Sequence, residues 1–324
     1  TAGSSTTAGA APELHAALKI NINAKTAHKV FLLFITTSII FTINRYLLLY
    51  NISLLLLYNS DMNTKDPISS RQNKLIKKMR ALQKGKARKK TGLFLVEGIH
   101  HVGAAIEADW QIETLLYAPD LLKSAYARDL LTASAKKGIS CQAASTNVFR
   151  SLARKDNPQG ILAAVQQRTR KLGDFTAVQR GVALLSPQDP GNLGTILRTM
   201  DAVGADALIL LDGGVDLYHP TVMRASMGAL FWVPTARATF DDFRHWAQDR
   251  DLPLIGASAH GEVDLSALQG ISARWLLLLG SEQKGFTEEQ RAACNTLISL
   301  PMRGQGSSLN LAVAAGIFLY ELTK

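Results

Sequence analysis

The sequence predicts an α/β protein in which a small α/β domain precedes a larger domain built on a parallel sheet. Three observations predict this class. The chain has 324 residues, enough for two domains with a core each. From residue 181 onward, short apolar runs alternate with helix-like stretches, as in a parallel sheet covered by helices on both faces. A polar segment, residues 167–181, separates this part from a compact α/β unit before it.

Residues 1–61 form an atypical extension before these domains. No Asp, Glu, Gly or Pro occurs from His15 to Ser60, and the longest apolar run, "VFLLFITTSIIFTI", has 14 residues. A membrane-spanning helix needs roughly 18 to 20. A signal-anchor, a membrane hairpin and translated upstream sequence outside the working protein all remain open. We favour the last, because the composition changes abruptly at Met62 and no small-residue cleavage site follows the apolar core. Membrane association is therefore not expected.

Composition favours a polyanionic partner. The chain contains 36 Lys and Arg against 26 Asp and Glu, a formal net charge of +10. Cys141 and Cys294 lie far apart and outside any C-x-x-C spacing, which fits a protein of the reducing cytoplasm without a disulfide framework. The neighbours His100 and His101 would project about 100° apart on a helix, so no metal site is expected.

The first domain, residues 62–170, opens with a basic helix. The stretch 71–90 contains no acidic residue, and apolar side chains at 75, 76, 79 and 82 recur at helical spacing, so that one face packs inward. The absence of acidic partners favours contact with nucleic-acid phosphates over a solvated charged face or a short basic tail. The candidate RNA-binding residues are Arg71, Lys74, Lys77, Lys78 and Arg80; Arg88 belongs to the same run. Strands are expected at 92–98, 112–118 and 160–167, and helices at 99–110 and 120–138.

The second domain, residues 171–324, is expected to have strands at 182–186, 207–211, 252–258, 274–280 and 296–301, with ligands bound beyond their carboxyl ends. The helix that opens near Asn192 has a buried stripe, which places Arg198 on nearly the opposite face. Either Arg198 meets a ligand or it is a solvated arginine, and Asn192 is either a site residue or an N-cap. The expected stripe is Leu193, Ile196, Leu197 and Met200.

Two further segments follow strands. Gly280 and Gly285 let the backbone approach a cofactor closely, and Glu282 between them is either a site residue or a charged loop residue. The turn 302–310 is rich in Gly, Ser and Asn and precedes the helix-like stretch 311–322. A plain N-cap would need only one such residue, Ser308 or Asn310, yet several are present.

The order of these segments resembles a known family. "NLGTILRT", "GSEQKGF" and "LPMRGQGSSLNLAVAAG" resemble motifs 1, 2 and 3 of the SpoU or TrmH-type RNA methyltransferases of the SPOUT superfamily, and "VMRASMGALFWVP" is also similar to that family. The resemblance covers the chain from about residue 70. "FLVEGIHHV" and the basic helix are similar to the small, ribosomal-protein-like substrate-binding domain that many members carry.

The resemblance implies a SPOUT-type parallel sheet with a C-terminal trefoil knot in residues 171–324, an exception to the rule that chains do not thread loops. It implies that residues 62–170 bind RNA substrate and that the turn 302–309 wraps S-adenosylmethionine. The cofactor-binding residues that it implies are Gly280, Ser281, Glu282, Gly285, Ile298, Leu300, Ser308 and Leu309.

The activity that the resemblance implies is methyl transfer from S-adenosylmethionine to a ribose 2′-hydroxyl of ribosomal or transfer RNA, by a cytoplasmic homodimer. Family accounts make Arg198 a general base or activator that acts with the partner subunit's cofactor pocket. Because a guanidinium stays protonated, we favour a phosphate clamp that also eases formation of the 2′-alkoxide. The implied catalytic residues are Arg198, Asn192, Glu282, Ser308 and Asn310.

Two departures from the family pattern concern the substrate. Many members have Gly at the position of Gln283 and Glu at that of Ser307, which leaves subfamily and substrate open. A methyltransferase acting on a base nitrogen and a non-catalytic RNA-binding protein are the alternatives. A membrane-anchored protein would rest on residues 30–58 alone. The sequence does not say which nucleotide is modified, or whether methylation confers antibiotic resistance.

Overall fold

The structure is a computed structural model of the chain. It describes residues 66–259, 261, 263–265, 273–306 and 308–324, together with 29, 36 and 43–47. Most of the apolar extension, and with it the choice among its interpretations, lies outside the described residues, as does Ser307. The chain divides into two units, residues 1–63 and 64–324, and both sheets belong to the second. Within the described residues, no helix has the length and apolar character needed to cross a membrane.

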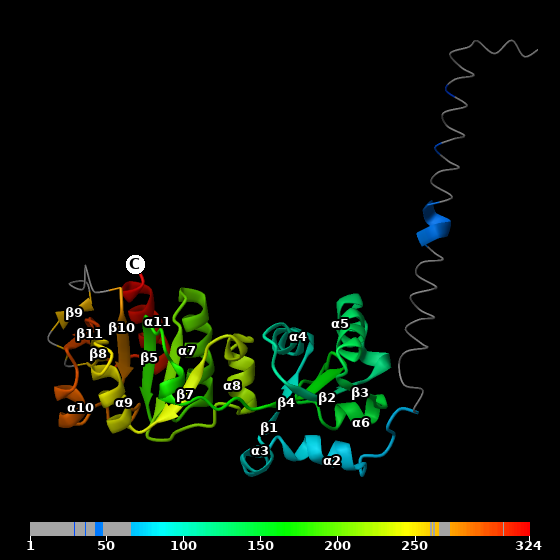
Figure 1. The fold of residues 1–324 in the computed structure, drawn as a ribbon, viewed down its shortest axis with the longest axis horizontal. Helices are drawn as coiled ribbons and strands as arrows, with labels where there is room; N and C mark the ends of the chain where they lie inside the picture. The colour runs from blue at the N-terminus through cyan, green and yellow to red at the C-terminus, as the bar shows by residue number, and fades with distance from the viewer. Residues whose placement is uncertain are drawn as a thin grey trace, which may run out of the picture. The chain divides into compact units, whose positions relative to one another are not determined.

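The first sheet has four strands in the order β1-β4-β2-β3 (Figure 1). β4 is antiparallel to β1 and β2, whereas β2 and β3 are parallel. Apolar side chains of α2 and α6 pack against β1, β2 and β4 to form its core. The elements of this part are α2 Lys74–Ala81, α3 Gly85–Thr91, β1 Leu93–Glu97, α4 Ile99–Glu107, β2 Ile112–Tyr117, η1 Pro119–Leu121, α5 Ala125–Lys136, β3 Ser140–Ala143, α6 Thr146–Arg150 and β4 Ile161–Gln166.

The basic run differs from the single helix expected for it. It forms two helices, α2 and α3, with Lys84 as the N-cap of the second. Ile76, Met79 and Leu82 are buried as the spacing predicted. Arg88, in contrast, does not face solvent: its side chain is 3% exposed and pairs with Asp216, 128 residues further along the chain. A buried, paired guanidinium cannot serve as a phosphate contact, so Arg88 does not share the role favoured for the basic run to which it belongs.

The second sheet has seven parallel strands in the order β7-β6-β5-β10-β8-β11-β9. β6 and β10 are buried throughout and β5 nearly so, because both faces of a parallel sheet are covered. The aromatic side chains of α9 pack on one face of the strands. Helix α7 packs against both α8 and α11 (Figure 1). Its elements are η2 Leu172–Asp174, β5 Arg180–Leu185, α7 Pro190–Val203, β6 Ala207–Leu211, α8 Pro220–Ala225, η3 Ala229–Phe231, β7 Thr235–Ala238, α9 Phe240–Gln248, β8 Leu254–Ala257, β9 Val263–Asp264, β10 Trp275–Leu279, α10 Glu288–Ala292, β11 Thr296–Ser299 and α11 Leu311–Leu322.

Helix α7 matches the stripe predicted for it. The four expected apolar residues are buried and Arg198 is exposed. The helix begins at Pro190, with Asp189 as its N-cap: Asp189 Oδ1 accepts a hydrogen bond from the Asn192 N–H at 2.7 Å. The interpretation of Asn192 as a simple N-cap is therefore excluded, and its side chain is available for other contacts.

The chain crosses itself closely near β11. This strand pairs with β8 on one side and with β9 on the other, although β8 and β9 are consecutive in sequence. At Gly261, between them, an added Cβ would lie 2.4 Å from the carbonyl carbon of Ile298, so only glycine fits this crossing. The parallel sheet expected from the resemblance is confirmed. The trefoil knot stays a prediction.

A glycine in the first motif sets the spacing of two helices. At Gly194 in α7, an added Cβ would lie 2.6 Å from Ala225 Cβ and 2.8 Å from the Val222 carbonyl oxygen of α8. We expect Gly194→Ala to destabilise the protein by about 1–3 kcal/mol, because α8 backbone must move away. Urea unfolding measures the effect. Gly85→Ala is the control, since its Cβ would find its nearest atom at 3.6 Å; equal losses in both variants would contradict the explanation.

Candidate active site

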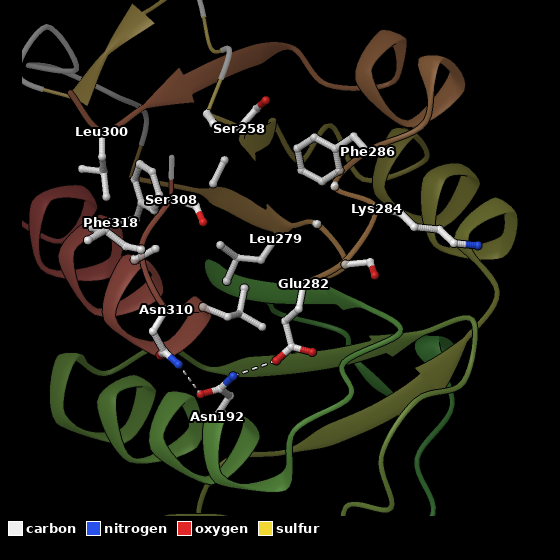
Figure 2. A pocket seen from close by; sticks show the side chains of 18 of the residues that line it. Asn192, Ser258, Leu279, Glu282, Lys284, Phe286, Leu300, Ser308, Asn310 and Phe318 are labelled. Carbon is white, nitrogen blue, oxygen red and sulfur yellow. Dashed lines mark hydrogen bonds between the residues drawn. The ribbon is translucent and has the colours of Figure 1, made fainter. Parts of the chain in front are cut away.

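A pocket of about 650 Å³ lies beyond the carboxyl ends of β8, β10 and β11 (Figure 2). This volume is in the range of small-molecule sites. Parallel strands end at one edge of the sheet, so loops distant in sequence meet there. The pocket is bounded by residues 257–259 at the end of β8, by the end of β10 and the loop that follows it, by residues 300, 302 and 308–310 after β11, and by residues of α7 and α11.

The loop after β10 is a tight turn closed by two glycines. The Gly285 N–H donates to the Ser281 carbonyl oxygen at 2.9 Å, and Gly285 has φ of 62°, a conformation that favours glycine. An added Cβ at Gly280 would lie 3.0 Å from the carbonyl carbon of Gly285. A side chain at either position would open the turn, so backbone rather than side chains faces this part of the pocket.

Three loops are joined by a hydrogen-bond network at the pocket wall (Figure 2). Asn192 Nδ2 donates to Glu282 Oε1 at 2.7 Å, and Asn310 Nδ2 donates to Asn192 Oδ1 at 3.0 Å. The Gln188 N–H donates to Glu282 Oε2 at 2.9 Å. The network therefore links the loop before α7, the loop after β10 and the start of α11.

Each amide in this network has one orientation. Glu282 is an acceptor, so Asn192 must direct its NH₂ group toward it and its oxygen toward Asn310. Asn310 uses its own oxygen to accept from the Ala312 and Val313 N–H groups, which makes it the N-cap of α11. Both carboxylate oxygens of Glu282 already accept hydrogen bonds. This arrangement suits positioning of the loops rather than proton abstraction.

The structure brings together most of the residues predicted to bind a cofactor. Ser308, Leu300 and Leu309 line the pocket with the loop Gly280–Gly285. Ile298 does not line it: the side chain is fully buried in β11, and its carbonyl oxygen accepts from the Ser258 N–H at 2.9 Å. Its contribution is to the sheet beneath the pocket.

Arg198 is the predicted catalytic residue that the structure leaves outside the pocket. It is exposed on α7, six residues beyond Asn192, which corresponds to about 9 Å along the helix axis. Arg198 is not among the described residues that line the pocket.

Several pocket residues were not predicted from the sequence. Ala257 ends β8 and Ser258 follows it, and Phe286 and Phe318 contribute aromatic walls (Figure 2). The rule that ligands bind beyond strand ends could have indicated Ser258. Phe318 could not have been predicted by this rule, because its spacing in α11 is that of an ordinary core residue.

Lys284 and Arg291 are the basic side chains that line the pocket. No metal-binding group of three or more His, Cys, Asp or Glu occurs among the described residues.

The predicted RNA-binding residues differ in their availability. Arg71, Lys74 and Lys77 are exposed. Lys78 pairs with Glu113 of β2, and Arg80 donates to Ser151 Oγ at 3.0 Å. The sequence suggested no acidic partner within the run, but tertiary folding supplies one for Lys78.

Comparisons with known proteins agree with this architecture. Residues 179–320 match the model of the SpoU rRNA Methylase family, and residues 73–163 match the MRM3-like substrate binding domain. A crystal structure of an AdoMet-bound rRNA methyltransferase from Sinorhizobium meliloti superposes with a TM-score of 0.72 at 34% identity, covering 79% of this chain and 97% of that one. The fold and the pocket therefore define the class of SPOUT methyltransferases that carry a separate substrate-binding domain.

Curated relatives narrow the class to a family. A 23S rRNA (uridine(2479)-2′-O)-methyltransferase from Streptomyces viridochromogenes is 32% identical over 246 residues, which is 73% of this chain and 84% of the relative. A 23S rRNA (guanosine(2553)-2′-O)-methyltransferase from Bacillus subtilis (strain 168) is 30% identical, over 79% of this chain and 98% of the relative. The chain belongs to the SpoU rRNA methylase family.

Proposed function

We propose that this protein transfers a methyl group from S-adenosylmethionine to a ribose 2′-hydroxyl of ribosomal RNA. One observation carries the proposal: the three motif residues Asn192, Glu282 and Asn310 bond to one another at the wall of a pocket built from motifs 2 and 3. Relatives that share most of the chain are named as 2′-O-methyltransferases of 23S rRNA.

The pocket fits the cofactor. Leu279, Leu300, Leu309, Phe286 and Phe318 offer apolar walls for an adenine ring, and the glycine turn exposes backbone groups that can hydrogen-bond its edge. Bound S-adenosylmethionine supplies an electrophilic methyl group on its sulfonium.

The chain's own residues then have positioning and electrostatic tasks. The Asn192–Glu282–Asn310 network holds the loops in one arrangement, which lets Ser308 contribute its hydroxyl to the site. Alignment of the weak 2′-hydroxyl nucleophile with the methyl group is the main requirement of this chemistry. Arg198, protonated, binds a phosphate near the target ribose and lowers the cost of forming the alkoxide.

The proposal includes a homodimer. Val313, Ile317 and Tyr320 are exposed on α11 at spacing i, i+4, i+7, so they form an apolar stripe along one face of the helix. A second copy of the chain is the partner we propose for this stripe. Such a dimer allows Arg198 of one subunit to act at the pocket of the other, in agreement with its position outside the pocket of its own subunit.

We expect the double substitution Val313→Asp/Ile317→Asp to convert the dimer to a monomer, since charged residues in an apolar interface are desolvated without partners. Sedimentation velocity measures the change. Ala133→Asp, at an exposed position of α5, is the matched control and should leave the association state unchanged. If the Val313→Asp/Ile317→Asp variant remains dimeric, the dimer interface does not involve this stripe.

The remaining parts of the proposal concern RNA and location. Residues 62–170 act as the RNA-binding domain and 171–324 as the methyltransferase domain, with Arg71, Lys74 and Lys77 as exposed phosphate contacts. A protein that acts on ribosomal RNA is expected in the cytoplasm.

Radiolabelled methyl transfer to total RNA, followed by nucleoside analysis, tests the function. We expect the label in a 2′-O-methylnucleoside of ribosomal RNA. Label on a base would indicate the base-nitrogen alternative, and label in transfer RNA would change the substrate. RNA binding without affinity for S-adenosylmethionine would indicate a non-catalytic RNA-binding protein.

A further inference from the structure

A basic hollow of about 430 Å³ lies at the edge of the second sheet, away from the cofactor pocket. It is lined by β7 and by the segment 167–171 that connects the two sheets. In the strand order, β7 is three strands from β10, which corresponds to about 14 Å at the usual strand spacing. The hollow shares no lining residue with the pocket described above.

The charges around this hollow are strongly unbalanced. Five basic residues line it, Lys89, Arg168, Arg170, Lys171 and Arg237. The acidic lining residue, Asp216, is already paired with Arg88. Within the described residues, the side chains of Lys89, Arg170 and Lys171 form no ion pair. Three uncompensated cations at one hollow attract an anion.

The backbone that carries these cations is held in place. Tyr218 Oη donates to the Arg168 carbonyl oxygen at 2.7 Å and accepts from the Arg168 N–H at 3.0 Å. Burial raises the pKa of the Tyr218 phenol to about 12, so the hydroxyl keeps its proton. The Arg168 guanidinium lies over the Trp110 ring at 4.5 Å from its centroid. A preorganised segment binds a ligand with little loss of conformational entropy.

An aromatic side chain adjoins the basic hollow. A second hollow of about 220 Å³ shares Arg168, Arg170 and Tyr218 with the first, so the two are adjacent. Trp232 lines this second hollow and is 50% exposed. Exposed Trp is a stacking surface for an unpaired base, and cations beside it match the phosphates that flank such a base.

We propose that these two hollows form one groove, which binds a single-stranded segment of the substrate RNA through phosphate contacts of Lys89, Arg170 and Lys171 and a base stacked on Trp232. The inference rests on the proposed function for the identity of the RNA. It adds an RNA site between the two sheets, distinct from the exposed face of α2.

Binding of a fluorescein-labelled 12-nucleotide single-stranded RNA to the full chain, measured by anisotropy over a range of salt concentrations, tests the groove. The triple substitution Lys89→Gln/Arg170→Gln/Lys171→Gln should weaken binding and reduce the slope of log affinity against log salt by about 2, at about 0.7 per lost phosphate contact. Its charge-matched control is Lys123→Gln/Lys136→Gln/Lys137→Gln, at exposed positions of the first domain outside the groove. This control should retain the slope.

Trp232→Ala should weaken binding about 5-fold or more without changing the salt slope, because stacking releases no counterions. Trp232→Phe keeps an aromatic face and should restore most of the affinity. Unchanged affinity for S-adenosylmethionine in every variant shows that the pocket is intact.

Equal losses in the triple variant and its control would overturn the groove proposal, as would wild-type binding by the groove variants or a preference for duplex RNA of the same length. The groove proposal and the proposed function can fail separately. If the protein methylates ribosomal RNA but the groove variants bind RNA as the wild type does, the proposed function holds and the groove proposal fails. If the groove variants bind RNA more weakly but the wild-type protein transfers no methyl group, the groove proposal holds and the proposed function fails.

Discussion

Arg198→Ala is expected to lower methyl transfer to ribosomal RNA at least about 100-fold, the effect of removing one preorganised charge that stabilises a developing oxyanion. The affinity for S-adenosylmethionine should not change, because Arg198 does not line the pocket. Single-turnover methyl transfer and calorimetric cofactor binding measure the two quantities. Arg198→Lys keeps the charge but lacks the planar fork, and should recover only part of the rate.

The proposed dimer provides a sharper test of the same residue. Mixing Arg198→Ala subunits with subunits that carry Gly285→Val, which opens the glycine turn, produces heterodimers with one complete site. With equal mixing and exchange, half of the dimers are of this kind, so about a quarter of the wild-type activity should return. Absence of recovery in a proven heterodimer would mean that Arg198 acts within its own subunit.

Asp216→Ala is expected to cost about 3–5 kcal/mol of unfolding free energy, because it leaves the Arg88 charge buried without its partner. The Arg88 Nε and Nη2 groups donate to Asp216 Oδ2 at 2.8 and 2.7 Å, and the Arg88 side chain is 3% exposed. Nη1 keeps its bonds to the carbonyl oxygens of Leu82 and Gln83. Urea unfolding measures the loss.

The double substitution Arg88→Met/Asp216→Ala is the matching control. It removes both charges and replaces the guanidinium by an apolar side chain, so it should be more stable than Asp216→Ala alone. If the double variant loses as much unfolding free energy as Arg88→Met and Asp216→Ala lose together, then packing, rather than the unpaired charge, explains the cost.

Regular elements of the second sheet were largely predictable from the sequence. The runs "VALLS", "ALILL" and "RWLLLLG" coincide with β5, β6 and β10, because strands buried on both faces need continuous apolar residues. The short strands β7 and β9 of this sheet, and β3 of the first sheet, were missed. Each has four residues or fewer, so the pattern is too short to indicate a strand.

The candidate site was predictable in part. Glycines 280 and 285 were correctly placed in a loop after a strand, since their conformational freedom is a property of the residue itself. The ion pair of Arg88 was not predicted, because the carboxylate that pairs with it lies 128 residues away and a charge run carries no sign of such a partner. The groove residues Lys89, Arg170 and Trp232 were likewise unpredictable, because two segments and a loop meet there only in space.

By itself, then, the sequence determined the α/β class, the buried stripe of α7 and the glycine turn after β10, since each follows from local residue pattern and backbone freedom. Only the tertiary structure decided that Asn192, Glu282 and Asn310 form one network, because Glu282 lies 90 residues and Asn310 lies 118 residues after Asn192 in the sequence. Parallel strands bring their carboxyl ends to one edge of the sheet, and that convergence makes distant loops into a site.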